Sequence, residues 1–256
     1  MLRTIKLVLA YDGTDYAGWQ RQVPARGKTI QGEVESAIHR LLGASVTLYG
    51  AGRTDAGVHA RGMTAHFQTE SDIPLQGMQR GVNCMLPRDI RVMSVENVAN
   101  DFHARYNASG KRYVYSFWVG ETMPPLLLRY AAPVRPPLVI ETMRQCLPFL
   151  IGSHDFASFE ATGSRDQSSE QGRGSVRTIH HAGLEADPVE PGLYHLTVSG
   201  DGFLRHMVRN IVGTLFEAGR GRISPDHFAV IIEARQRALA GPTAPACGLV
   251  LEEVYY

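Results

Sequence analysis

The order of strand-like and helix-like segments in the first half of the chain constrains its fold most strongly. Four apolar runs with strand-like alternation are interleaved with two segments whose apolar residues recur every three or four positions. In chain order these segments are residues 5–10, 30–42, 46–48, 65–67, 74–86 and 90–95. Thr29 can cap the first helical segment and Gly43 can end it. The resulting order, β-α-β-β-α-β, predicts an antiparallel sheet with both helices on one face.

The second half shows a similar order with additional proline-rich connections. Its predicted elements are a strand at 113–119, a helix at 140–150, strands at 176–184 and 194–199, helices at 203–216 and 224–232, and a closing strand at 248–256. The polar segment 163–175 is expected to be a mobile loop. We therefore predict an α+β fold of two tandem βαββαβ (ferredoxin-like) halves, residues 1–110 and 111–256. They are expected to form a mostly antiparallel sheet, with helices packed on one face and a central cleft.

A glycine-rich stretch follows the strand-like alternation at 46–48. It reads AGRTDAGVHA over residues 51–60, with one carboxylate, Asp55, at its centre and Arg53 two positions earlier. One interpretation is an Asx-type turn, in which Asp55 binds the backbone and Gly57 adopts a positive φ. The other is a functional carboxylate on a rigidly mounted loop. Local chemistry leaves both interpretations open.

The helical segment 203–216 carries an apolar stripe and two arginines on its other side. Arg205 and Arg209 lie four positions apart, so both are expected to point the same way from one helical face. Two arginines beside an apolar stripe usually form a solvated edge, so this spacing alone does not give them a role.

Residues 11–20 combine turn-forming residues with two tyrosines and a tryptophan. These rings either fill a hydrophobic space beneath a loop or form a surface that contacts nucleic-acid bases. The net charge is only +1, so the total charge does not indicate a nucleic-acid binder. Only three of the 26 Lys and Arg residues are lysines. An excess of arginine suits phosphate contacts, but a GC-rich genome explains it equally well.

Absent motifs argue against several kinds of chemistry. The sequence has no GxxxxGK[ST] phosphate loop, no GxGxxG between a strand and a helix, and no GxSxG nucleophile motif. The three cysteines lie far apart without a CxxC pair, which favours a reducing cytoplasm over a zinc knuckle or a disulfide framework. No apolar run is long enough to span a bilayer. A metal site built from Asp12, Asp15, His59 and His66 is an alternative.

A single aspartate on a glycine-rich loop, several arginines and aromatic segments are consistent with cofactor-free carboxylate chemistry on RNA. Segments spread over nearly the whole chain then resemble the TruA family of tRNA pseudouridine synthases. They are YDGT at 11–14 with GWQ at 18–20, GRTDAGVHA at 52–60, FHAR at 102–105, KRYVY at 111–115, MVRNIVGT at 207–214 and APACGL at 244–249. Met63 departs from the family pattern, where glutamine is common.

The resemblance implies an isomerase that converts uridine to pseudouridine at positions 38, 39 and 40 in the anticodon stem-loop of tRNA. The N1–C1′ bond breaks, the uracil turns, and C5 bonds to C1′. Because the atoms and the redox level are unchanged, no cofactor and no metal are expected. Asp55 would be the catalytic nucleophile, attacking C1′ or the base, or would remove the 2′ proton.

The resemblance also implies roles for other residues. Arg209, rather than Arg205, would be the cationic partner that keeps Asp55 ionised and fixes its orientation. Tyr113 would stack on the uracil and take the C5 proton, while Leu249 would pack against the base. The further residues expected to contact RNA in the cleft are Arg53, Arg205 and His206.

The TruA family works as a homodimer, with one tRNA reaching across both subunits. The expected partners are therefore tRNA and a second copy of this chain, without a membrane. A catalytically silent tRNA-binding or chaperone protein on the same scaffold is one rival interpretation. A metal-dependent hydrolase is the other.

Overall fold

The structure is a computed structural model that describes residues 1–23, 25, 27–161 and 174–256. By internal packing, the chain divides into two compact units. Unit 1 comprises Met1–Ser109 and Val250–Tyr256, and unit 2 comprises Gly110–Leu249. The division into two functional halves, residues 1–110 and 111–256, remains a prediction. Most of the loop expected at 163–175 lies outside the described residues.

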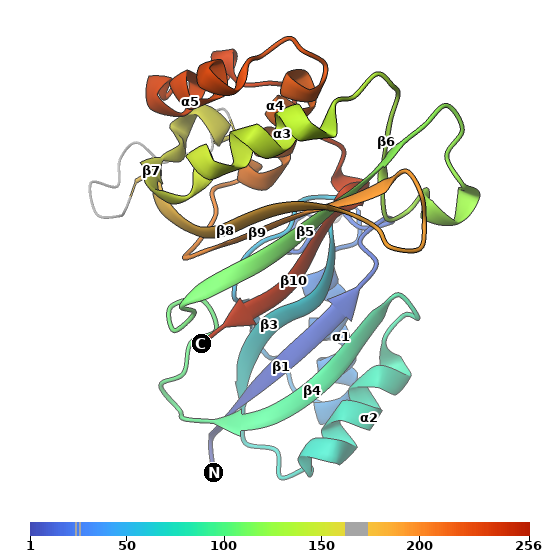
Figure 1. The fold of residues 1–256 in the computed structure, drawn as a ribbon. Coiled ribbons are helices and arrows are strands. Elements are labelled where there is room, and N and C mark those ends of the chain that lie inside the picture. Colours follow the sequence, from blue (N-terminus) through green and yellow to red (C-terminus); the bar gives the residue numbers. More distant parts are fainter. Residues whose placement is uncertain (24, 26, 162–173) are drawn as a thin grey trace. The chain divides into compact units, whose positions relative to one another are not determined.

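Unit 1 contains a mixed, mostly antiparallel sheet (Figure 1). Strand β1 (Arg3–Tyr11) lies between β3 (His59–Thr69) and β4 (Ile90–Val98) and is antiparallel to both. The two-residue strand β2 (Tyr49–Gly50) also pairs with β3 in antiparallel orientation. Strand β10 (Leu249–Tyr255) pairs with β3 in parallel, which brings the C-terminal residues into unit 1. The strand order is β4-β1-β3-β10.

Both helices of unit 1 lie on the same side of this sheet (Figure 1). Helix α1 (Ile30–Leu42) begins after Thr29, whose side chain accepts a hydrogen bond from the backbone N–H of Gly32, and ends at Gly43 in the left-handed conformation. Helix α2 (Leu75–Met85) begins after Pro74. The buried core of the unit includes Ile5, Leu7, Leu9, Val34, Ile38, Phe67, Met78 and Val82. The predicted order β-α-β-β-α-β is confirmed for this unit.

The strands of unit 2 are also mostly antiparallel to one another. The long strands are β5 (Gly110–Val119), β8 (Val176–Ala186) and β9 (Leu193–Gly200). Strand β9 pairs with β5 on one side and β8 on the other, both in antiparallel orientation. The short strand β7 (Gly152–Asp155) extends the sheet beyond β8, and β6 (Ala132–Val134) is parallel to β5.

Three helices of unit 2 gather on one side of its sheet (Figure 1). They are α3 (Ile140–Cys146), α4 (Met207–Gly219) and α5 (Pro225–Ala234). Ser224 caps α5 by accepting a hydrogen bond from the backbone N–H of His227. Short 3₁₀ turns occupy Pro125–Leu127, Leu147–Leu150, Phe156–Phe159, Arg237–Leu239 and Ala246–Gly248. Fully buried aromatic rings, including Phe117, Phe156, Phe159 and Phe228, fill the core.

The second half differs from its predicted pattern in three places. The helix expected over 140–150 changes to a 3₁₀ turn at Leu147, because Pro148 cannot donate the next helical hydrogen bond. The helix expected from residue 203 begins only at Met207. The short strands β6 and β7 were not predicted. The fold is nevertheless α+β with mostly antiparallel pairing, and none of its described helices is long and apolar enough to cross a membrane.

Candidate active-site loop and arginine pocket

Asp55 lies on the loop that joins β2 to β3 in unit 1. The backbone N–H of Ala51 donates to the Thr64 carbonyl (2.8 Å) at the start of this loop, and that of Val58 donates to the Asp55 carbonyl (3.2 Å) at its end. Gly57 has a φ of 76°, so the positive φ expected for the turn is confirmed. The Asp55 side chain is partly exposed and Arg53 is exposed. The loop thus combines a tight turn with a carboxylate that reaches the surface.

The segment from Tyr11 to Trp19 fixes this loop from beneath. The Trp19 backbone N–H donates to the Thr54 carbonyl (3.0 Å), and the Tyr11 hydroxyl shares a hydrogen bond with the Thr54 hydroxyl (2.8 Å). A Cβ atom on Gly18, whose φ is 98°, would lie 2.6 Å from the Thr54 carbonyl oxygen. Only glycine allows the two backbones to approach so closely. Thr54, the residue directly before Asp55, is therefore held by long-range contacts through both its carbonyl and its hydroxyl.

The aromatic side chains of this segment are packing residues. Tyr11, Tyr16 and Trp19 are 5%, 6% and 2% exposed, so their rings fill the space beneath the Asp55 loop. The Tyr16 hydroxyl donates to Asp89 Oδ1 (2.8 Å), and burial raises the pKa of this tyrosine well above its ordinary value. Of the two interpretations of residues 11–20, the structure therefore favours rings that fill a hydrophobic space beneath a loop over an exposed surface that contacts bases.

The alternative metal site does not form. His59 Nδ1 lies 3.1 Å from Asp12 Oδ1, but His66 follows seven residues later on the same strand, roughly 23 Å away along its axis. His66 Nδ1 instead accepts a hydrogen bond from the backbone N–H of Ala104 (3.1 Å). Among the residues that the structure describes, no group of three or more His, Cys, Asp and Glu is arranged to hold a metal ion.

In unit 2, helix α4 holds Arg209 against the segment that follows the 3₁₀ turn Arg237–Leu239. Arg209 Nε donates to the Ala244 carbonyl (2.8 Å), and the Ala244 backbone N–H donates to the Arg209 carbonyl (3.1 Å). This reciprocal pair fixes the direction in which the arginine side chain leaves the helix.

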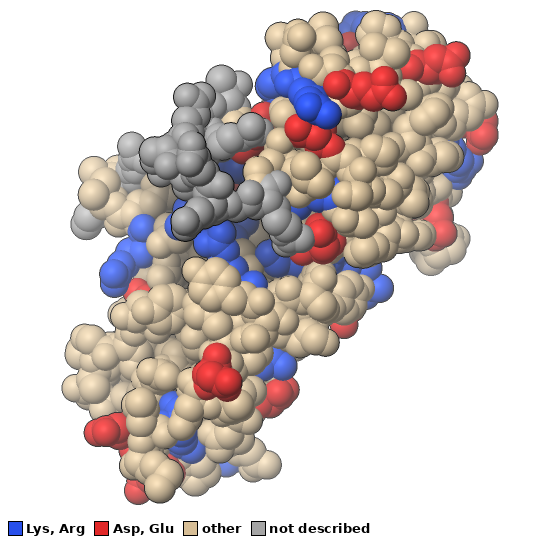
Figure 2. Space-filling model, turned by 90° about the vertical axis from the view of Figure 1, so that its left-hand side faces the viewer, with Lys and Arg blue, Asp and Glu red and all other residues tan. Residues whose placement is uncertain are grey.

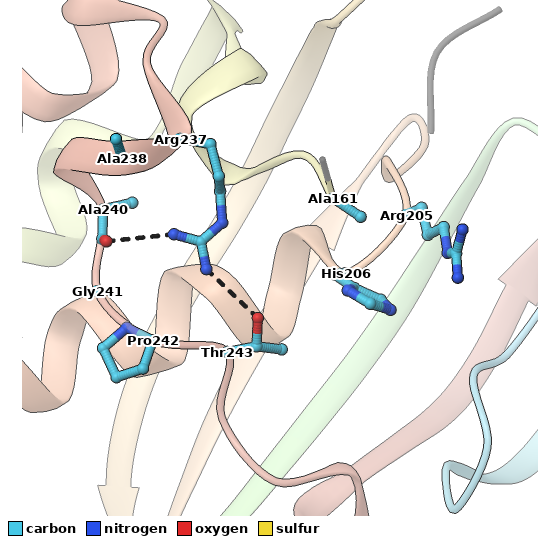
Figure 3. A pocket seen from close by; sticks show the side chains of 9 residues that line it. All are labelled: Ala161, Arg205, His206, Arg237, Ala238, Ala240, Gly241, Pro242 and Thr243. Carbon is cyan, nitrogen blue, oxygen red and sulfur yellow. Dashed lines mark hydrogen bonds between the residues drawn. The ribbon is translucent and has the colours of Figure 1, made fainter. Parts of the chain in front are cut away.

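A polar network centred on the buried Asn210 keeps this segment in place. Asn210 Oδ1 accepts from the Thr243 hydroxyl (2.6 Å) and from Arg237 Nη2 (3.1 Å), while its Nδ2 donates to the Phe159 carbonyl (2.7 Å). Arg237 also donates to the Ala240 carbonyl and the Thr243 hydroxyl, as the dashed lines in Figure 3 show. Burial lowers the pKa of the Arg237 guanidinium from its ordinary value. Because both groups that donate to Asn210 Oδ1 come from residues 237–243, the network fastens this segment to α4.

Helix α4 and the same segment also meet at a glycine. A Cβ atom on Gly213 would lie 1.6 Å from the Pro242 carbonyl oxygen, well inside any tolerable contact. The Thr214 hydroxyl accepts from the Gly241 backbone N–H (2.9 Å) and donates to the Asn210 carbonyl (2.7 Å). The segment 241–243 therefore lies directly on the backbone of α4. It can come this close only because residue 213 is glycine and has no Cβ atom.

An open pocket of about 660 Å³ lies beside this network in unit 2 (Figure 3). Arg237 lines it from one side, and Arg205 and His206 line it from the turn before α4. The remaining lining residues are Ala161, Ala238, Ala240, Gly241, Pro242 and Thr243. Acidic and basic side chains are mixed over the helical part of unit 2, at the top of Figure 2. Arg205 and Arg237 give the lining of the pocket a positive charge.

The prediction that Arg205 and Arg209 share a helical face is wrong. His206 adopts a φ of 62°, in the left-handed region, so regular helix begins only after it. Arg205 therefore belongs to the preceding turn, where its carbonyl accepts from the Ala161 backbone N–H (3.0 Å). A left-handed conformation at a residue other than glycine is uncommon, and such residues cluster at functional sites.

The other predicted residues of unit 2 are largely buried. Tyr113 lies on β5 and is 8% exposed, with its ring 5.1 Å from that of Phe203 in edge-to-face geometry. Leu249 is 6% exposed and follows the 3₁₀ turn Ala246–Gly248. The sequence did not point to Arg237 and Thr243. Asn210 and Gly213 belong to the MVRNIVGT motif, but only the structure shows that they hold the segment 237–243 against α4.

Together, these features define an α+β protein with a rigid carboxylate loop and an arginine-lined pocket. The sequence pattern of a family described as tRNA pseudouridine synthase matches residues 7–107 and 149–256. Full-length relatives carry the same description with the suffix A. The chain therefore belongs to the TruA family of tRNA pseudouridine synthases, and the resemblance found in the sequence is confirmed.

Relatives match the chain from end to end. "tRNA pseudouridine synthase A 1" of Desulfotalea psychrophila is 49% identical over 255 residues, covering 100% of both chains. The corresponding protein of Acetivibrio thermocellus is 45% identical over 255 residues, again with 100% of both chains. That of Moorella thermoacetica is 45% identical over 252 residues, 98% of this chain and 99% of its own. A solved Cbf5–Nop10–Gar1 complex gives a TM-score of 0.34 at 11% identity, covering 96% of this chain and 57% of that one, too weak a likeness to support a conclusion.

Proposed function

We propose that this protein isomerises uridine to pseudouridine at positions 38, 39 and 40 in the anticodon stem-loop of tRNA. Family membership over the whole chain makes it a tRNA pseudouridine synthase, an isomerase. The observation that supports Asp55 as the catalytic nucleophile is the mounting of its loop. Thr54 is held through both its backbone and its side chain, and the carboxylate next to it reaches the surface. Such a mount can hold one reacting group in a fixed position.

The reaction requires a carboxylate and no change of oxidation state. Asp55 attacks C1′ or the base, or removes the 2′ proton, and the freed uracil turns before C5 bonds to C1′. The target base must leave its stack before any of these steps. In this proposal residues 1–110 supply the carboxylate loop, and residues 111–256 supply the groups that complete a cleft for the RNA.

The assignments of six further residues rest on the family motifs and on local geometry. Arg209 is the cationic partner of the carboxylate, and its bond to the Ala244 carbonyl supports a fixed orientation. Tyr113 stacks on the uracil and accepts the C5 proton, and Leu249 packs against the base. The residues proposed to contact the RNA around them are Arg53, Arg205 and His206. The left-handed backbone of His206 and the pocket that it lines with Arg205 support that last assignment.

We also propose that the protein acts as a homodimer on tRNA in the cytoplasm. We infer the dimer from the TruA family, which works as a homodimer, and the location from the substrate, tRNA.

The direct test is to incubate purified protein with an unmodified tRNA transcript and map pseudouridine at single-nucleotide resolution. We expect modification at positions 38 to 40 when uridine is present there, with the same yield in the presence of EDTA. A transcript with cytidine at these positions is the matched control and should remain unmodified. Loss of pseudouridine formation in EDTA would contradict the metal-free mechanism. Binding of tRNA without any pseudouridine formation would favour the silent binding protein.

The affinity for tRNA is expected to fall steeply with salt concentration. Each phosphate contact made by Arg or Lys adds about −0.7 to −0.9 to the slope of log affinity against log salt, because bound counterions are released. With Arg53 and Arg205 both on phosphates, the slope should be about −1.5 or steeper. Fluorescence anisotropy of labelled tRNA over a salt series measures it. A flat response would contradict the assignment of these arginines.

A further inference from the structure

The histidine of the GRTDAGVHA motif, His59, has no part in the proposed chemistry. It is the first residue of β3 and lies four positions after Asp55. It is only 3% exposed, so its ring is out of reach of a bound RNA. Any role of this histidine in the reaction must therefore pass through the residues that it contacts.

The imidazole ring of His59 binds the turn that follows β1. Its Nδ1 accepts a hydrogen bond from the backbone N–H of Gly13 (3.1 Å) and also lies 3.1 Å from Asp12 Oδ1. A neutral ring accepts at Nδ1 from Gly13, whereas a protonated ring donates from the same nitrogen to Asp12. The ring is thus attached to this turn in either protonation state.

The turn itself is ordered by further contacts. Asp12 Oδ1 accepts from both the backbone N–H (3.0 Å) and the hydroxyl of Thr14, which is the pattern of an Asx turn. The Asp12 backbone N–H donates to the Asp89 carbonyl (2.9 Å). His59 therefore binds a turn whose position within unit 1 is already fixed.

The same turn lies against the end of the Asp55 loop. A Cβ atom on Gly13 would lie 2.0 Å from the Val58 carbonyl oxygen, an approach that only glycine allows. Val58 in turn donates its backbone N–H to the Asp55 carbonyl. Because Val58 directly precedes His59, the ring and the backbone fix the same point of the loop.

The Asp55 loop is thus bound at both ends by one segment, residues 11–19. The residue directly before the carboxylate is held by this segment, as described above. After the carboxylate, the Gly57 backbone N–H donates to the Tyr16 carbonyl (3.3 Å), and His59 adds its side-chain contact. A reacting group that is held from both sides keeps the narrow range of positions that bond formation requires.

We propose that His59 is a positioning residue, whose bond to Gly13 fixes the C-terminal end of the loop and thereby the direction of the Asp55 carboxylate. This inference rests on the proposed function, in which Asp55 is the reacting group. The alternative is a histidine that only fills space. Against it, Gly13 is buried, and a buried backbone N–H needs a hydrogen-bond partner that an apolar side chain at position 59 would not supply.

The test uses three variants of the full-length protein. His59→Leu roughly keeps the volume of the ring but offers no acceptor. His59→Asn places an amide oxygen close to the position of Nδ1, so it can accept the bond from Gly13. His59→Gln is equally polar, but its amide lies one bond further from the backbone, near the position of Nε2, and should lose that bond. The glutamine variant keeps the test decisive if His59→Leu fails to fold.

Single-turnover rates and tRNA binding separate positioning from contact with the substrate. The rate of pseudouridine formation should fall about 100-fold in His59→Leu and His59→Gln, because a small displacement of a reacting group has an effect of this size. His59→Asn should recover most of the lost rate. The affinity for tRNA, measured by fluorescence anisotropy, should equal that of the wild type in all three variants, since His59 is buried.

Amide hydrogen exchange of the free protein tests the positioning without reference to tRNA. The backbone N–H groups of Gly57 and Val58 should exchange faster in His59→Leu and His59→Gln than in the wild type and His59→Asn. A wild type that formed no pseudouridine would refute the proposed function, and the exchange rates would still report whether His59 holds the loop.

His39→Leu is the matched control, since His39 is an exposed histidine of the same unit on α1. It should leave both the rate and the exchange unchanged. A folded His59→Leu or His59→Gln protein that reacts at the wild-type rate would overturn the proposal. So would equal losses of rate in His59→Asn and His59→Gln, because the bond to Gly13 would then not be the property that matters.

Discussion

Replacement of Asp55 by alanine is expected to abolish pseudouridine formation while tRNA still binds. The variant removes the proposed reacting group, and loss of such a group typically lowers the rate by about 10⁴-fold or more. The hydrogen bonds from Trp19, Tyr11 and Val58 use the backbone of this loop and the Thr54 hydroxyl, not the Asp55 carboxylate, so they remain possible in the variant. Single-turnover mapping of pseudouridine measures the rate, and anisotropy measures tRNA binding.

Asp55→Asn is the matched control, because it keeps the size and shape of the aspartate side chain. The amide fills the same space and still forms hydrogen bonds, but it does not ionise. If the reaction requires a carboxylate, Asn should be nearly as inactive as Ala. Normal turnover by either variant would refute the mechanism. If a variant instead lost tRNA binding to the same extent as activity, the Asp55 loop would be a binding element. The interpretation as a catalytically silent tRNA-binding protein requires that result.

The sequence predicted those parts of the fold that are determined locally. Helix α1 is an example, because its cap at Thr29, its apolar stripe and its end at Gly43 all lie within fifteen residues. The order of unit 1 followed from such elements. The Asp55 loop was located from a short motif, and its positive φ at Gly57 followed from residue type.

Contacts between residues far apart in the sequence determine the features that the sequence did not predict. Trp19 lay in a segment that was equally compatible with an exposed surface, and only its packing under the Asp55 loop, 35 residues later in the chain, resolved this. Helical periodicity placed Arg205 beside Arg209, but the left-handed His206 ended that pattern. Asn210 binds Arg237 and Thr243 across 27 and 33 residues, and no local pattern announces such a network.

The second large effect is expected from Gly213→Ala, a change of one methyl group on α4. Alanine favours helix in general, yet the new Cβ would lie 1.6 Å from the Pro242 carbonyl oxygen. Backbone atoms must therefore move, and overpacking of this kind costs about 1–3 kcal/mol or more in the free energy of unfolding. The displaced segment includes Ala244, whose carbonyl orients Arg209, so pseudouridine formation should fall even where the variant is fully folded. Urea denaturation and single-turnover rates at a low temperature measure the two effects.

Gly77→Ala on α2 separates crowding from helix propensity. A Cβ atom there would meet the Ile73 side chain at 3.4 Å and the Pro74 side chain at 4.0 Å, both ordinary contacts, so the substitution should stabilise the protein by about 0.5 kcal/mol. Its rate of pseudouridine formation should equal that of the wild type. If Gly213→Ala stabilised the protein as Gly77→Ala does, the close approach of Pro242 to α4 would be wrong. If Gly213→Ala lost stability but kept full activity, Arg209 would not need the Ala244 carbonyl, and its assigned role as a fixed cationic partner would fail.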